Sequence, residues 1–138
     1  MGAGLLFAAL AVGAPALKDK DPTGLAGEWV PTGGTVDGKD SPPQGPPCRY
    51  VFRADGTWEI RVDGKRQYGG TYAADPAARP PALDLGVRGT DLVHLSIYRV
   101  AGDRLAVVQG WPGAARPGGF EAPKGARQTL MEFARVKK

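Results

Sequence analysis

The sequence predicts an all-β protein, an antiparallel up-and-down meander of about eight strands closed into a barrel. Bulky apolar side chains alternate with polar ones through residues 50–72, which is typical of a half-buried sheet. Asp-Gly pairs at residues 55–56 and 63–64 interrupt this alternation where hairpin turns are expected. The 138 residues include 21 Gly and 13 Pro, a composition that favours short strands and turns over long helices. A chain of this length is sufficient for one domain with a buried core.

Residues 1–16 are predicted to be a signal peptide and not part of the barrel. They contain an apolar run followed by an Ala-Pro-Ala cleavage pattern. The run is too short to cross a bilayer, so we expect no stable membrane span and an exported protein, periplasmic or extracellular. A short buried N-terminal helix is the alternative interpretation. Residues 17–24 are then an N-terminal lead-in, and residues 25–137 form the barrel domain.

The first half of the domain is expected to supply four strands. Trp29 opens the first, which should reach Val36, and the Asp-Gly-Lys sequence at residues 37–39 then turns the chain. Residues 40–47, DSPPQGPP, contain too much proline for a strand or a helix. We predict that they form an extended, exposed loop. Residues 50–72 follow as three strands joined by the two Asp-Gly turns.

The second half supplies the remaining strands, which we expect at residues 82–85, 92–100, 104–109 and 129–136. A Gly- and Pro-rich loop, residues 110–128, precedes the last of them. A meander of this kind leaves two exposed edges, and pairing the last strand with the first removes both by closing a barrel. A flattened sandwich is the alternative.

Several short motifs follow one another along residues 25–137. In order they are Leu25-x-Gly27-x-Trp29, Asp37-Gly38-Lys39, Phe52-x-x-Asp55-Gly56-x-Trp58, Gly70-Thr71-Tyr72-x-x-Asp75-Pro76, Pro81-x-x-Asp84-Leu85, Ile97-Tyr98-x-x-x-Gly102-Asp103-x-Leu105 and Arg116-Pro117-x-x-Phe120. Their order and spacing resemble the small lipocalin-like domain of unknown function that is greatly expanded in planctomycete bacteria. The resemblance implies a calycin-type, lipocalin-like β-barrel on exported proteins, and it brings no established activity.

The Gly27-x-Trp29 opening is also similar to that of the lipocalins proper, in which the Trp closes the barrel floor beneath an Arg of the last strand. By position, Arg135 fills that role here, with its guanidinium stacked on the indole. Gly27, Trp29 and Arg135 are therefore assigned a structural role. The chain lacks the later conserved blocks of the lipocalins and any disulfide, so no lipocalin ligand is carried over.

No arrangement of reactive side chains points to catalysis. Cys48 is the only cysteine and His94 the only histidine, so a disulfide, a zinc site or a hydrolytic triad has no second member. The carboxylates outside the turns, Glu59 among them, are expected on solvated strand faces. We therefore expect no enzyme, no cofactor and no metal. The 18 basic and 14 acidic side chains are scattered, which argues against nucleic-acid binding.

The best functional candidate is the loop that carries Trp111, Arg116 and Phe120. Binding groups are often held on loops above a rigid scaffold, and two aromatic rings with a cation could line a pocket mouth or bind a partner. The alternative is a lid, in which Phe120 plugs one barrel end and Arg116 pairs with a surface acid.

Two functional hypotheses remain open. The first is a non-enzymatic exported barrel that binds a small apolar or amphipathic ligand inside, or an extracellular protein at its loop end. The alternative is a structural or protein-interaction module with a fully packed interior. An interior cavity of about 300 Å³ or more would support the ligand. The large side chains expected to fill the interior are Tyr50, Phe52, Trp58, Ile60, Tyr68, Tyr72 and Phe133.

Overall fold

The computed structural model describes residues 21–43 and 46–137, and these form strands and connections without a helix. The strands are β2 (Gly27–Val36), β3 (Lys39–Asp40), β4 (Cys48–Phe52), β5 (Thr57–Val62), β6 (Lys65–Asp75), β7 (Ala82–Gly86), β8 (Val93–Ala101), β9 (Arg104–Gly110) and β10 (Gln128–Arg135). The predicted signal peptide, residues 1–16, and residues 17–20 of the lead-in lie outside the described residues.

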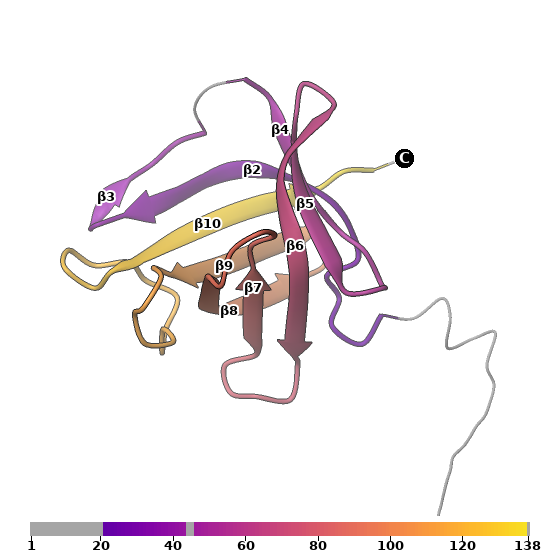
Figure 1. The fold of residues 1–138 in the computed structure, drawn as a ribbon. Coiled ribbons are helices and arrows are strands. Elements are labelled where there is room, and N and C mark those ends of the chain that lie inside the picture. The colour runs from indigo at the N-terminus through magenta and orange to yellow at the C-terminus, as the bar shows by residue number, and fades with distance from the viewer. Residues whose placement is uncertain (1–20, 44–45, 138) are drawn as a thin grey trace, which may run out of the picture.

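Eight of these strands form a closed antiparallel barrel, with β3 as a short addition beside β2 (Figure 1). Sequential strands pair with one another from β4 through β10, and β2 pairs with β4. The barrel closes because β10 also pairs with β2, from Thr129 opposite Val36 to Arg135 opposite Trp29. The predicted up-and-down barrel is confirmed, and the flattened sandwich is not formed.

Two of the predicted turns are two-residue hairpin loops. Asp37 and Gly38 join β2 to β3 with φ angles of 52° and 81°, and Asp63 and Gly64 join β5 to β6 with 51° and 78°. A type I′ turn requires positive φ at both central residues, which explains why Asp-Gly pairs occupy these two turns. At the third Asp-Gly pair the connection between β4 and β5 is longer. There the Asp55 carboxylate accepts bonds from the Thr57 backbone N–H (3.0 Å) and hydroxyl (2.7 Å).

The interior of the barrel contains the hydrophobic core. Its buried members are Leu25, Trp29, Phe52, Trp58, Leu83, Leu85, Tyr98, Leu105, Val107 and Phe133, with Tyr50, Ile60, Tyr72 and Met131 among those packed against them. The Tyr50 and Phe133 rings meet edge to face with centroids 4.8 Å apart, and those of Phe52 and Tyr72 at 5.2 Å. These geometries are the ones that aromatic pairs prefer.

Tyr68 was expected in this interior, and that prediction is wrong: the residue is 61% exposed. The reason is the length of β7, which pairs with β6 only from Tyr72 to Asp75. The remainder of β6 therefore projects with β5 past the end of β7, as Figure 1 shows. No neighbouring strand is present there to cover the ring.

One end of the barrel is closed around Trp29. The guanidinium of Arg135 lies 4.2 Å from the centre of the indole ring, and Trp29 Nε1 donates to the Leu25 carbonyl at 2.9 Å. Arg135 also donates to the carbonyls of Ala26 (3.0 Å) and Gly24. A Cβ at residue 27 would lie 3.0 Å from Arg135 Nη1, and the φ there is 131°. Gly27 is therefore required by both space and backbone conformation.

Candidate functional site

The three loop residues proposed from the sequence do not form one site. Trp111 is 38% exposed, and its Nε1 donates to the Thr129 hydroxyl at 3.1 Å. Arg116 lies 2.8 Å from an Asp84 carboxylate oxygen and donates to the Ser96 carbonyl, also at 2.8 Å. The Phe120 ring lies under the guanidinium of Arg99, 4.3 Å from its centroid. Each side chain therefore contacts a different part of the barrel.

These contacts show that residues 111–127 lie across the outer face of the barrel. Asp84 lies between two core residues of β7, and Arg99 between Tyr98 and Val100 of β8, so both point outward. Arg116 and Phe120 meet them on that side. Phe120 consequently does not plug a barrel end, as the lid alternative had proposed, whereas Arg116 does pair with an acid.

A second apolar layer lies outside the barrel, on the face that this loop crosses. Ile97 of β8 and Val108 of β9 are paired across the sheet and are both 0% exposed, although they stand on the outward side of their strands. Pro117 and Ala122 of the loop are buried as well. The far part of the loop is fixed to the β2–β3 turn, where Gly38 N–H donates to the Ala122 carbonyl at 2.7 Å. The loop therefore has a packing role on the outer face of the barrel.

Among the described residues, His94 and Cys48 do not belong to a cluster of metal-ligand side chains. His94 Nδ1 lies 3.0 Å from the Gly110 carbonyl oxygen. Within residues 21–43 and 46–137, no three or more His, Cys, Asp or Glu side chains come together as metal ligands would. Burial raises the pKa of the Cys48 thiol, which favours the unreactive protonated form.

A broad hollow lies where β2 separates from β4. The two strands pair only from Gly27 opposite Phe52 to Trp29 opposite Tyr50. Two residues after Trp29 comes Pro31, which has no backbone N–H to donate to a strand ladder. The register of β2 against β10 then shifts, so that Thr32 has no residue of β10 opposite it. Such a bulge bends a strand and increases its twist. As a result β2 turns away from β4 and continues along β10.

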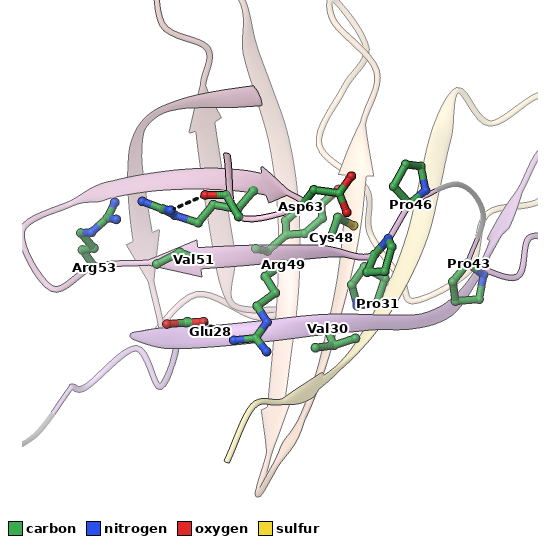
Figure 2. Close-up of a pocket in the computed structure, with 14 residues that line it drawn as sticks. Glu28, Val30, Pro31, Pro43, Pro46, Cys48, Arg49, Val51, Arg53 and Asp63 are labelled. Carbon is green, nitrogen blue, oxygen red and sulfur yellow. Dashed lines mark hydrogen bonds and ion pairs between the residues drawn. The ribbon is translucent and has the colours of Figure 1, made fainter. Parts of the chain in front are cut away.

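We call the resulting hollow the β2–β4 groove. It has a volume of about 880 Å³ and is open to solvent. Figure 2 shows its wall of prolines from β2 and the loop before β4, and its row of charged side chains on the other side. The residues that line it are Glu28, Val30, Pro31, Pro43, Pro46, Pro47, Cys48, Arg49, Tyr50, Val51, Arg53, Arg61, Asp63 and Gly64.

A smaller hollow of about 140 Å³ adjoins the groove along the same separation of strands. The two share Pro31, Pro43 and Tyr50, and the smaller one extends to Met131 and Phe133 at the margin of the core. Both open to the surface. Neither is a closed chamber inside the barrel, and the smaller one is below the size expected for a drug-sized ligand.

The floor of the groove carries a network of ion pairs. Arg49 contacts Glu28 at 2.9 Å, Arg53 contacts Glu59 at 3.1 Å, and Arg61 also pairs with Glu59. Glu59 is only 4% exposed, so its predicted position on a solvated strand face is wrong. It stands opposite Gly69 of β6, which has no side chain, and the two arginines cover it. The hydrogen bond from Arg53, opposed by burial and aided by Arg61, lowers the pKa of Glu59.

Among the ion-paired groups the guanidiniums are the most exposed. The side chains of Arg49, Arg53 and Arg61 are 53%, 42% and 43% exposed, whereas those of Glu28 and Glu59 are 34% and 5% exposed. Sequence reasoning missed this set. Alternation along β4 and β5 could have placed the three arginines on the outer face, but nothing in the sequence shows that β2 leaves this face open.

In comparisons with protein-family models, curated proteins and solved structures, nothing matches this chain significantly. Within the part of the chain that the structure describes, no helix has the length and apolar character needed to cross a bilayer. The site is therefore interpreted from its own geometry.

Proposed function

We propose that this protein is a non-enzymatic, exported, lipocalin-like barrel that binds a protein partner, with an extended segment of that partner held in the β2–β4 groove. The signal peptide, export and the relationship to lipocalins are parts of this proposal. The observation that carries it is the separation of β2 from β4 beyond Trp29, beside an interior that is already filled.

An extended polypeptide suits the groove because strand backbones form two of its walls. Within residues 21–43 and 46–137, residues 30–33 of β2 have no ladder partner on the side facing β4, and Cys48 and Arg49 of β4 have none on the side facing β2. A peptide laid along such edges can gain main-chain hydrogen bonds while its side chains enter neighbouring pockets. Val30, Val51 and the prolines offer an apolar surface for those side chains.

A small apolar ligand inside the barrel is the second candidate. One observation favours it: the Tyr98 hydroxyl is buried in the interior without a hydrogen-bond partner among the described residues, and burial raises the pKa of Tyr98 to about 12. A polar group of this kind could orient a ligand. The packed aromatic side chains around it leave the groove as the better supported site.

The groove can be blocked at an exposed residue. Val30 is 38% exposed and lines it, so Val30→Trp should fill the groove without disturbing the core. Val93→Trp, at a 45% exposed position outside the groove, is the matched control. Displayed random peptides of about seven residues are selected on the wild-type protein and then measured on both variants.

We expect selected peptides to bind the Val30→Trp variant at least about tenfold more weakly and the Val93→Trp variant unchanged. Failure to select any peptide, or equal binding to both variants, would contradict the proposal. The apolar dye N-phenyl-1-naphthylamine tests the second candidate. Saturable dye binding that Val30→Trp leaves intact would support an interior ligand instead.

A further inference from the structure

We propose that the β2–β4 groove selects a partner segment that carries acidic side chains, and that Arg49 is the residue that binds a carboxylate of that segment. This inference rests on the proposed function, which it deepens by naming the chemistry of the partner. It is carried by the arrangement of the guanidinium groups and their partners.

The arginines are held in place by two acids: Glu59, which is nearly buried, and Glu28, which lines the groove with its side chain 34% exposed. Arg49 of β4 stands directly opposite Arg61 of β5, an arrangement that is unfavourable for two like charges. It persists because Arg61 pairs with Glu59, beneath the surface, while Arg49 pairs with Glu28 at the rim. Three guanidiniums pair with two carboxylates, and Asp63 is a third acid on the groove, so the formal charges of these groups sum to zero. Selection of an acid therefore depends on the exposed guanidinium donors and not on an excess of positive charge.

Arg49 and Arg53 also keep donors free. A guanidinium has about five N–H groups in a planar fork that matches a carboxylate. Arg49 uses Nη1 on Glu28 and Arg53 uses Nη1 on Glu59, whereas Arg61 engages both Nε and Nη1. Since Arg49 and Arg53 are about half exposed in the groove, their remaining donors can bind a carboxylate without breaking an existing pair.

The remaining acid of the groove, Asp63, lies toward its other end. Its backbone N–H donates to the Pro47 carbonyl at 3.4 Å, and Figure 2 shows it beside Cys48 and Pro46, away from Arg53. Asp63 is therefore separated from Arg53 within the groove, while Glu28 remains paired with Arg49.

A polypeptide is favoured over an acidic polysaccharide. Only a polypeptide can use the unpaired strand edges of β2 and β4. Tyr50, an aromatic side chain that lines the groove, is partly buried and packs edge to face against Phe133 in the core. The occupant inferred here is therefore an extended acidic peptide.

The test compares the composition of peptides selected on three proteins: wild type, Arg49→Gln and Arg104→Gln. Arg104 is exposed and does not line the groove, so its replacement is the matched control for charge. Thermal melting followed by circular dichroism verifies that each variant is folded. Arg53 is left unchanged because it is a partner of the buried Glu59.

On the wild type and on Arg104→Gln, we expect Asp and Glu to be enriched about threefold or more over the input library, and to fall to the input level on Arg49→Gln. The best peptide should bind about tenfold more weakly when its acids become amides, and more weakly at about 300 mM salt than at about 50 mM.

Peptides that bind in the groove without an acidic bias, or whose bias survives Arg49→Gln, would overturn this inference and leave the proposed function standing. If no peptide depends on the groove at all, the proposed function itself fails. Polygalacturonate that displaces the peptides and requires Arg49 would assign the site to an acidic polysaccharide, which also overturns the inference.

Discussion

Trp29 is the residue on which one end of the barrel depends. It is 0% exposed, lies under the Arg135 guanidinium and donates to the Leu25 carbonyl. These contacts join the first strand, the last strand and the segment before the first strand. The ring therefore stabilises closure of the barrel as well as its core.

Replacing Trp29 with Ala should lower the free energy of unfolding by about 3–5 kcal/mol, because a buried indole is lost and a cavity remains. Thermal melting should show a fall of more than about 10 °C. Trp111→Ala is the control, since that ring is 38% exposed. A similar small change in both variants would show that Trp29 does not close the barrel.

Glu59 gives the protein a defined sensitivity to acid. The hydrogen bond from Arg53 lowers its pKa in the folded state, with Arg61 acting in the same direction against burial. A carboxylate with a depressed pKa stabilises the fold above its unfolded value of about 4.3 and loses that contribution as pH falls through its folded pKa.

Glu59→Gln should therefore cost about 1–3 kcal/mol at pH 7, the range for a hydrogen bond to a charged group. The difference from wild type should shrink as the pH is lowered below about 4. Urea unfolding at a series of pH values measures it, with exposed Glu132→Gln as control. A difference that stays constant down to acid pH would exclude the ion pairs as its source.

Among the elements, the loop of residues 111–127 has a different role from the one its sequence suggests. An aromatic ring, a cation and a second aromatic ring on a flexible segment favour binding, but each contacts a separate part of the outer wall. The signal for packing was in β8, where both faces are apolar. Nothing in the sequence of the loop shows that Pro117 and Ala122 are buried.

Ile97→Ala tests this packing. The side chain is 0% exposed outside the barrel, so its truncation should cost about 2–5 kcal/mol, as in an ordinary core. Leu92→Ala, on the loop before β8 and 45% exposed, should cost less than about 1 kcal/mol. Chemical unfolding compares the two. Equal and small costs would mean that the loop does not cover Ile97 in solution.

The strands and turns could be predicted because their signals are local. Alternation placed β4, β5 and β6, and Asp-Gly pairs at residues 37–38 and 63–64 fixed two hairpins. The groove could not be predicted, because it depends on how β2 meets β4 and β10 at once. Pro31 was a visible breaker within the first strand, but its effect appears only in the register.

At the scale of the whole molecule, the barrel separates its core from its candidate site. Residues such as Trp29, Phe52, Trp58 and Phe133 fill the interior, while the arginines and prolines of the groove lie outside. A partner could then bind without entering the core. This separation predicts that binding and interior packing respond to different substitutions.

The most direct test is two-dimensional ¹H–¹⁵N NMR of the wild-type protein titrated with a peptide selected on it. Binding in the β2–β4 groove predicts amide shift changes confined to residues 28–34, 48–53 and 61–64, which flank the groove, and none in the loop of residues 111–127. Changes centred on that loop, or on interior residues such as Tyr98 and Leu105, would contradict it.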